Sequence, residues 1–442
     1  LRTLTHFDKV IITDSDNIAN IKVTHSVHQL SLDVEYTKST LQKLFDIAAD
    51  TFSYLGKCTQ PLFSPSNTEV RPSVIHNQVT ESITKPAILY HKEVNMLNHN
   101  LKKCGVNTPY IPKAEIQRAV NSYKPILLSK KVKELCRILT YEEAIAGSED
   151  SSFLSGVTRK SSPGYPYVLT RPSGKPGKTA WFGDVEYIYD AKIKERVDVL
   201  ATLAKQGIRA PYVWTDTLKD ERRPIQKVDE LKTRVFASGP QDYLILFRMY
   251  FLGFVANVME NRVNNEQSIG TNPFNSDWGR TAHKLSRFGD KVFAGDFSTF
   301  DGTLNSCIMH AFVDVINEWY DDGEDNALLR HTLFLDIMNS VHLSGDKFYA
   351  CTHSQPSGNP LTTILNSWYN SVSMRIAFYR CAEKHGIKNI NFNDVVSMVS
   401  YGDDNVINFS DRIVSWFNQV EVTEAYASFG MIYTDEAKSG II

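Results

Sequence analysis

The chain has 442 residues, 42% of them hydrophobic and 22% charged, and a formal net charge of −2 at pH 7. These proportions are ordinary for a globular protein, and the length is enough for two or three domains with a large core. A near-neutral balance does not indicate nucleic-acid binding, which would need basic residues segregated from acidic ones. The six cysteines have no paired spacing, which argues for reduced intracellular thiols and against a zinc site.

The N-terminal half contains few patterns that bear on chemistry. Residues 1–35 are mixed and polar without clear periodicity, so we treat them as a leader or linker. Apolar residues at helical spacing then predict an amphipathic helix that packs on the core: Leu41, Leu44, Phe45, Ala48, Phe52 and Leu55. The longest apolar stretch, from Tyr243 to Met259, is interrupted by Arg248 and is short for a membrane span. A buried helix is predicted there instead, and no signal peptide is visible.

A basic segment runs from Lys219 to Arg234. Its basic residues are Lys219, Arg222, Arg223, Lys227, Lys232 and Arg234. Interleaved acidic residues, among them Glu221, are typical of an ordinary solvated face. The alternative is a site for a triphosphate, for which arginine supplies a two-pronged fork and lysine a point charge.

An apolar strand is predicted to end at Asp296, before an amphipathic helix. The helix is indicated by apolar residues at helical spacing: Leu304, Ile308, Phe312, Val315, Ile316 and Trp319. Asp296 could cap that helix, but Asp301 or Thr303 fits the cap position better. A carboxylate at a strand end is also a typical ligand of magnesium, which binds few protein carboxylates.

A loop that begins at Ser357 and Gly358 opens a long predicted helix. On that helix Thr362 and Asn366 are four residues apart and share one face. Such a polar stripe could be ordinary surface. Together with Asp301, however, it would form a hydrogen-bonding set able to recognise a ribose 2′-hydroxyl, the group that distinguishes RNA from DNA.

Two short β-branched segments flank the sequence Tyr401-Gly402-Asp403-Asp404. They predict a hairpin whose turn contains Gly402 and displays both carboxylates. Adjacent like charges are unfavourable unless a cation neutralises them, although a solvated turn would also suit this sequence. Beside Asp296, the pair would complete a set of acids able to hold two Mg²⁺ ions roughly 3.5–4 Å apart.

In this order, the four segments resemble the viral RNA-dependent RNA polymerases of the picornavirus-like superfamily. The basic segment is similar to motif F of that family, and Asp296 to Asp301 is similar to motif A. The segment from Ser357 to Ser367 is similar to motif B, and the Gly-Asp-Asp hairpin to motif C.

Two shorter segments extend the resemblance. Ser161-Ser162-Pro163-Gly164-Tyr165-Pro166 is similar to motif G, which guides the template strand, and Tyr433 to Ser439 is similar to motif D. The amino-acid sequences from Arg71 to His76 and from Tyr401 to Asn405 most resemble those of the dicistroviruses, which infect invertebrates and belong to the same group.

The resemblance implies an α+β, right-hand polymerase with fingers and palm, in which helices flank an antiparallel palm sheet. Residues 36–252 would form the fingers and residues 253–333 the first part of the palm. Residues 334–355 would return to the fingers, and residues 356–442 would complete the palm. The thumb of the family is missing from this sequence, so we expect a fragment of a polyprotein.

The implied activity is RNA-templated RNA synthesis, which transfers nucleotides from NTPs to an RNA 3′-hydroxyl and replicates a positive-strand viral genome. Asp296 and Asp403 would bridge two Mg²⁺ ions, with Mn²⁺ as a substitute, and Asp404 would be a weaker or outer ligand. Lys438 of the motif D segment would protonate departing pyrophosphate, unless it is an ordinary surface lysine.

The resemblance also assigns the substrate contacts. Binding of the NTP triphosphate falls to Lys219, Arg223, Lys227 and Arg234. Ribose recognition falls to Asp301, Thr362 and Asn366. Template binding falls to Ser161, Ser162, Gly164, Ser357 and Gly358.

The expected partners are the RNA template and product strand, NTPs, a viral protein primer and other viral replication proteins. The expected location is the host cytoplasm, in membrane-associated replication complexes, with no transmembrane segment in the chain itself. Two alternatives stay open. A reverse transcriptase shares the palm and paired aspartates, although Asp301 with Asn366 favours a ribonucleotide. A non-catalytic, palm-derived RNA-binding scaffold would be expected to have lost a metal ligand, and all of them are present.

Overall fold

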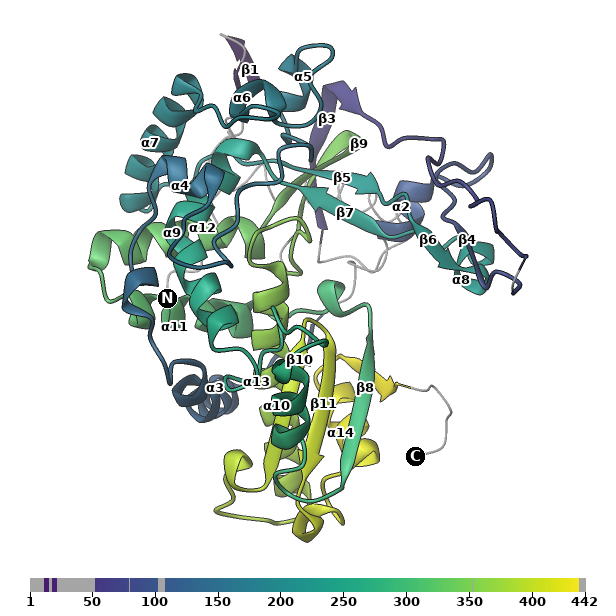
Figure 1. The fold of residues 1–442 in the computed structure, drawn as a ribbon, viewed down its shortest axis with the longest axis vertical. Coiled ribbons are helices and arrows are strands. Elements are labelled where there is room, and N and C mark those ends of the chain that lie inside the picture. Colours follow the sequence, from purple (N-terminus) through teal and green to yellow (C-terminus); the bar gives the residue numbers. More distant parts are fainter. Residues whose placement is uncertain are drawn as a thin grey trace, which may run out of the picture.

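The fold was obtained as a computed structural model, which describes residues 12–15, 18–21, 52–78, 80–101, 108–351 and 353–436. Most of the predicted helix around Leu41 and Leu44 lies outside the described residues. So does Lys438, the lysine of the predicted motif D. In Figure 1 the chain forms two lobes, each built around its own sheet, with a bundle of helices between and beside them.

The lower lobe in Figure 1 contains a four-stranded antiparallel sheet in the order β10-β11-β8-β12. Its strands are β8 (Val292–Ser298), β10 (Val396–Tyr401), β11 (Asp404–Phe409) and β12 (Ile432–Asp435). The predicted hairpin is confirmed, and so is the antiparallel palm sheet. Strand β8 continues past Asp296 to Ser298 because β12 pairs with it there, opposite Thr434 and Ile432.

Long helices cover this sheet and join the two lobes. They are α3 (Lys113–Leu127), α9 (Gln241–Glu260), α10 (Ser276–Lys284), α11 (Ser306–Tyr320), α12 (Glu324–Met338), α13 (Thr362–Lys384) and α14 (Gln419–Ala427). Helix α13 packs against β10, α3, α11 and α14, so it lies at the centre of the core. The apolar stretch predicted as a buried helix is α9. Among the described residues it is the one helix long and apolar enough to cross a membrane, and most of it is buried in the fold.

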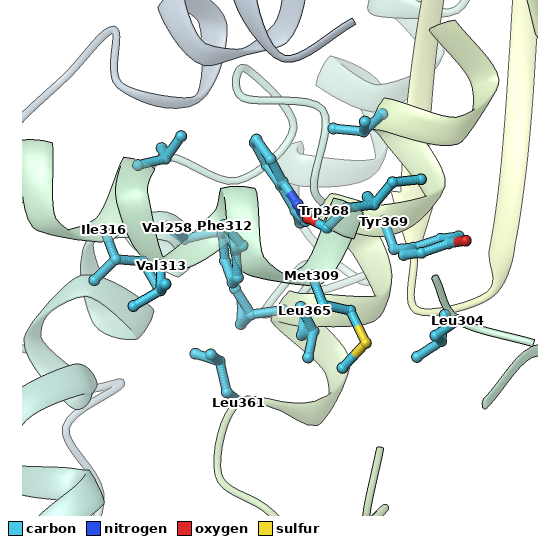
Figure 2. Close-up of a cluster of buried hydrophobic side chains, with 14 of the residues drawn as sticks. Val258, Leu304, Met309, Phe312, Val313, Ile316, Leu361, Leu365, Trp368 and Tyr369 are labelled. Carbon is cyan, nitrogen blue, oxygen red and sulfur yellow. Dashed lines mark hydrogen bonds between the residues drawn. The ribbon is translucent and has the colours of Figure 1, made fainter. Parts of the chain in front are cut away.

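Figure 2 shows the core where α11 and α13 meet. The labelled side chains are Val258, Leu304, Met309, Phe312, Val313, Ile316, Leu361, Leu365, Trp368 and Tyr369. Two hydrogen bonds fix the start of α11 on α13: the Tyr369 hydroxyl accepts from the Asn305 amide at 3.0 Å, and the Trp368 indole donates to the Ile308 carbonyl at 3.2 Å. The residues that precede α11 are thereby held against the helix that carries Asn366.

Helix α11 begins later than the sequence indicates. Its cap is Asn305, whose side chain accepts from the Cys307 amide at 2.9 Å, so the expectation of Asp301 or Thr303 at the cap is wrong. The cause is a short 3-10 turn, Phe300–Gly302, between strand and helix. This turn leaves the carboxylate of Asp301 available for contacts outside α11.

The upper lobe contains a mixed sheet in the order β3-β9-β5-β7. Its strands are β3 (Phe52–Leu62), β5 (Trp214–Leu218), β7 (Val235–Ser238) and β9 (Val341–Cys351). Phe52 and Leu55 lie in strand β3, which pairs with β9. The prediction that the helix extends to these two residues is therefore wrong. Strand β9 comes from the segment expected to return to the fingers, and its pairing with β3 and β5 supports that division as a proposal.

The remaining elements are short, apart from α7. The helices are α2 (Met96–Leu101), α4 (Tyr141–Ala146), α5 (Tyr167–Thr170), α6 (Thr179–Phe182), α7 (Ala191–Lys205) and α8 (Ile225–Asp229). Two-stranded ribbons are formed by β1 (Ile12–Ser15) with β2 (Ile18–Ile21), and by β4 (Thr84–Pro86) with β6 (Arg222–Pro224). Five cysteines lie among the described residues, namely Cys58, Cys136, Cys307, Cys351 and Cys381, and of these Cys58, Cys136, Cys307 and Cys381 are free thiols.

Candidate active site

The turn between β10 and β11 consists of Gly402 and Asp403 and is held by neutral groups from α13. Gly402 adopts a positive φ of 66°, a conformation that glycine reaches without strain. Its amide donates to the Ser367 hydroxyl at 2.8 Å. The Asn370 side chain donates to the carbonyls of Gly402, Asp403 and Asp404 at 3.2, 2.9 and 3.3 Å. The turn is thus fixed without using a positive charge.

The two residues at this tip are exposed, although the surrounding protein partly shields their carboxylates from water and places them near like charges. Loss of surrounding water raises the pKa of Asp403, and the negative charges of Asp404, Asp301 and Asp296 raise it further. Desolvation and the charges of Asp296 and Glu436 likewise raise the pKa of Asp404. In the part of the chain that the structure describes, neither Asp403 nor Asp404 forms an ion pair. A bound cation would relieve this repulsion.

Asp296 is brought to the hairpin by the register of β8. The last pair between the two strands, Asn405 opposite Gly295, is directly next to Asp404 and Asp296. Gly295 is required because a Cβ there would lie only 2.0 Å from the ring of Tyr433. That tyrosine donates to the Asn405 side chain at 2.7 Å, and so locks β12 and β11 across β8. The three predicted metal ligands therefore lie at one edge of the sheet.

Asn366 and Asp301, two of the three residues predicted to read the ribose, contact each other. The Asn366 amide donates to the Asp301 carboxylate at 3.0 Å, and its oxygen accepts a hydrogen bond from Gln355. Both ends of the Asn366 side chain are thereby fixed in a buried position. The hydroxyl of Thr362 instead donates to the carbonyls of Ser357 and Asn359, at 3.0 and 2.9 Å, and so stabilises the loop before α13.

Three of the four predicted triphosphate ligands gather around one carboxylate, Glu221. Arg234 forms a two-pronged ion pair with it, Lys219 lies at 3.2 Å and Arg223 at 3.9 Å. Burial alone would raise the pKa of Glu221, but the hydrogen bonds and charges of Arg234 and Lys219 outweigh it and lower that pKa. The negative charge of Asp403 also raises the pKa of Arg234, so this arginine lies within electrostatic range of the acidic tip.

Lys227, the fourth predicted ligand, does not join this cluster. It is half-buried on α8 and forms no ion pair with any described residue. Arg223 retains a buried Nε without a hydrogen-bond partner among the described residues. Both side chains therefore keep hydrogen-bonding capacity that an anionic ligand could use.

The two predicted template loops contact the same short stretch at the end of β7. A Cβ on Gly358 would lie 2.0 Å from the Ala237 carbonyl, and the Ala237 amide donates to the Ser357 hydroxyl at 3.4 Å. A Cβ on Gly164 would lie 2.3 Å from the Gly239 carbonyl. Glycine is thus required in both loops by close backbone approach, and the structure brings loops almost 200 residues apart to one strand end.

Two further residues predicted to bind the template lie in the exposed part of the first loop. Ser161 and Ser162 are exposed, and the buried ammonium of Lys178 donates to the Ser161 hydroxyl at 2.6 Å. Desolvation lowers the pKa of Lys178 to about 8. The loop therefore has a cation directly behind an exposed hydroxyl.

Sequence reasoning missed the residues that hold the others in place. Ser367 and Asn370 fix the hairpin turn, Gln355 orients Asn366, and Glu221 collects the basic side chains. A signal did exist for Ser367 and Asn370, since polar residues on a helix as buried as α13 need internal partners. No comparable signal exists for Glu221, which looks like any acid in a mixed-charge segment.

The chain is similar to known proteins in sequence and in fold. The family described as viral RNA-dependent RNA polymerase matches residues 98–442. The replicase polyprotein of Acute bee paralysis virus (strain Rothamsted) is 51% identical over 397 residues, which covers 87% of this chain and 21% of the polyprotein. That of Cricket paralysis virus (isolate Teleogryllus commodus/Australia/CrPVVIC/1968) is 41% identical over 423 residues, which covers 88% of this chain and 24% of the polyprotein.

A solved structure shares the fold. The sicinivirus 3Dpol RNA-dependent RNA polymerase superposes with a TM-score of 0.69 at 22% sequence identity, over 90% of this chain and 78% of that one. The chain spans about a fifth to a quarter of the length of the two polyproteins it matches.

Proposed function

Because this chain belongs to the viral RNA-dependent RNA polymerases, we propose that it synthesises RNA on an RNA template by nucleotidyl transfer from NTPs to an RNA 3′-hydroxyl. The expected similarity to dicistroviruses is confirmed by the two polyproteins. The comparisons favour neither a reverse transcriptase nor a non-catalytic scaffold. The activity would serve replication of a positive-strand viral genome.

The observation that carries the proposal is the placing of Asp296, Asp403 and Asp404 at one sheet edge, opposite a basic cluster. Carboxylate oxygens are the ligands that Mg²⁺ prefers. Desolvation, and after it the charges of the neighbouring acids, raise the pKa values of Asp403 and Asp404, and divalent cations would relieve the like-charge repulsion. The donor set thus fits Mg²⁺, with Mn²⁺ as a substitute. Two such ions would supply an activated 3′-hydroxyl and neutralise charge on the departing phosphates.

In this proposal the residues of the chain position the reactants. Asp296 and Asp403 would hold the cations, and Asp404 would be a weaker or outer ligand. Arg234, Lys219 and Arg223 bind the triphosphate, and Glu221 fixes their orientation. Lys227 would join them through its free ammonium. Lys438, which lies outside the described residues, would donate a proton to pyrophosphate.

The Asp301–Asn366 pair would distinguish ribonucleotides from deoxyribonucleotides. Asn366 is fixed at both ends, so its amide and the Asp301 carboxylate present a preset hydrogen-bonding edge. A site built to bond a hydroxyl rejects an analogue that lacks it, since its polar groups would lose a partner. Thr362 would act indirectly, through the loop that it stabilises.

Ser161, Ser162, Gly164, Ser357 and Gly358 would contact the template strand. Their two loops meet at the end of β7, which would place the template beside the basic cluster. We also infer that the chain works in the host cytoplasm, in membrane-associated replication complexes, with a viral protein primer and other viral replication proteins as partners.

Primer extension tests this function. The chain is incubated with an RNA template, an annealed RNA primer, Mg²⁺ and single labelled NTPs. We expect incorporation of the complementary ribonucleotide, dependent on Mg²⁺ and lost in Asp403→Asn. Equal or better extension with dNTPs would favour a reverse transcriptase, and RNA binding without any incorporation would favour a scaffold.

A further inference from the structure

Three potential metal ligands lie on the packed helices α11 and α12, which are adjacent in the chain (Figure 1), and none of the three was assigned to the polymerase motifs. His310 and Asp314 are one turn apart on α11, and His331 faces them from α12. The short connection between the two helices, residues 321–323, fixes their relative position. The pairing of the helices thus brings together residues that the sequence separates.

The geometry of this cluster is close to that of a bound metal ion. One carboxylate oxygen of Asp314 lies 3.3 Å from Nε2 of His331, and the other lies 3.8 Å from Nδ1 of His310. One ligand atom from each residue can be chosen so that all lie within 4.8 Å of one another. In a tetrahedral zinc site, bonds of about 2.0–2.1 Å place neighbouring ligand atoms roughly 3.3 Å apart. Small side-chain rotations would therefore close the site.

The two imidazoles lie beside each other on the facing helices. Their rings are stacked, with centroids 5.1 Å apart and an angle of 27° between planes. Metal ions bind the neutral imidazole through a ring nitrogen. Both histidines are half-buried and Asp314 is exposed, which leaves room for water as a further ligand.

We propose that His310, Asp314 and His331 bind one transition-metal ion of the zinc type and thereby link α11 to α12. Two imidazoles and one carboxylate suit Zn²⁺, Co²⁺, Ni²⁺ or Cu²⁺ better than Mg²⁺, which prefers oxygen ligands alone. The site is therefore chemically distinct from the carboxylates at the hairpin tip. The competing explanation is an ordinary ion pair between helices, in which one protonated histidine bonds Asp314 without a metal.

Isothermal titration with Zn²⁺ separates the two explanations. The full chain carries Asp403→Asn, and excess Mg²⁺ is present, so that the hairpin carboxylates do not contribute. We expect one Zn²⁺ per chain, and a loss of affinity of more than about 10–100-fold in either His310→Ala or His331→Ala, since removing a ligand costs more than removing its support. His385→Ala is the matched control, because His385 pairs with a single carboxylate, Glu421, at 3.2 Å.

A second measurement covers variants that lose stability. Thermal unfolding is followed with and without Zn²⁺ in the parent chain and in Asp314→Asn, His310→Gln and His331→Gln, which keep side-chain size. The proposal predicts that Zn²⁺ raises the unfolding temperature of the parent and of His385→Ala but not of these three variants. Absence of Zn²⁺ binding in the parent, or an unchanged isotherm and shift in the variants, would overturn it.

Discussion

The two sides of the candidate active site carry opposite charge, and the fold supports them differently. On the palm side, Asp403 and Asp404 lie on a turn held by the neutral groups of Ser367 and Asn370. On the side proposed as the fingers, Arg234, Lys219 and Arg223 surround an internal carboxylate, Glu221. The palm therefore leaves negative charge for a ligand to neutralise, whereas the fingers neutralise part of their own positive charge.

Under the proposed function, this difference in charge suits the two sides to different roles. Carboxylates that repel one another gain most from a compact divalent cation, which they can bind and release with each substrate. For the basic side chains, orientation matters more than additional charge. A guanidinium group that points in the wrong direction cannot donate to two phosphate oxygens at once. The comparison thus predicts charge-dominated effects in the palm and orientation-dominated effects in the fingers.

Removing one palm carboxylate should have the largest effect. Asp403→Asn keeps the shape of the turn but removes a metal-binding charge, and we expect nucleotide incorporation to fall by about 10³-fold or more, while RNA binding stays within a few-fold. Pre-steady-state incorporation and filter binding measure the two quantities. Asp411→Asn, on an exposed 3-10 turn of the same lobe, is the control. Near-normal RNA synthesis by Asp403→Asn would contradict the claim that the carboxylates at the hairpin tip bind the catalytic metal ions.

Loss of the Asn366 amide should change selectivity rather than rate. Asn366→Ala leaves Asp301 and Gln355 without their shared partner, which removes about 1–3 kcal/mol of discrimination between rNTP and dNTP, or roughly 5–150-fold. Parallel measurements of kcat/KM for matched rNTP and dNTP give this ratio. Thr362→Val tests the indirect role of the loop. If Asn366→Ala keeps the wild-type ratio, the 2′-hydroxyl is read elsewhere.

Glu221→Gln should have a smaller effect on nucleotide incorporation, because it removes the carboxylate that orients the basic side chains. The side chains of Arg234, Lys219 and Arg223 would lose their common anchor, and we expect incorporation at saturating NTP to fall by about tenfold. The affinity for NTP should change little, because the added net positive charge offsets the disorder. Glu230→Gln, which removes an exposed acid of the same segment, is the control. A large loss of NTP affinity at unchanged rate would contradict the orientation account.

The smallest predicted effect concerns stability at acid pH. The pKa of Glu221 is lowered in the fold, so its ion pairs stabilise the protein above its ordinary value of about 4.3 and lose that contribution as pH falls. The side chain is partly hydrated, so the contribution is about 1 kcal/mol or less. The difference in unfolding free energy between wild type and Glu221→Gln should therefore shrink below about pH 4. A constant difference from pH 7 to pH 3 would contradict the ion-pair assignment.

The palm was largely predictable from the sequence, since its signals are local. Gly402 between β-branched segments specifies a turn, and apolar spacing specifies α11 and α13. The failures arise where pairing over long distances decides the outcome. Phe52 and Leu55 fit a helix by spacing, but β9 recruits them into a strand. The cap of α11 lies later in the chain than predicted, because a 3-10 turn separates strand β8 from the helix.

The fingers were less predictable, because their function depends on which acid the bases surround. Mixed charges between Lys219 and Arg234 do not specify that Glu221, rather than Asp229 or Glu230, lies at the centre. Lys227 belongs to the same segment yet lies apart on α8. The cluster of His310, Asp314 and His331 was also not predictable from the sequence, because its third member is contributed only by the packing of α12 against α11.

The most direct test of the account is a titration of the chain with Mn²⁺, monitored by electron paramagnetic resonance of the free ion. Mn²⁺ prefers carboxylate ligands to imidazole, so it reports on the palm acids. We predict binding at the edge formed by Asp296, Asp403 and Asp404, weakened at least tenfold in Asp403→Asn and unchanged in Asp411→Asn. Identical isotherms for the wild type and Asp403→Asn would contradict the claim that the hairpin tip is a divalent-cation site.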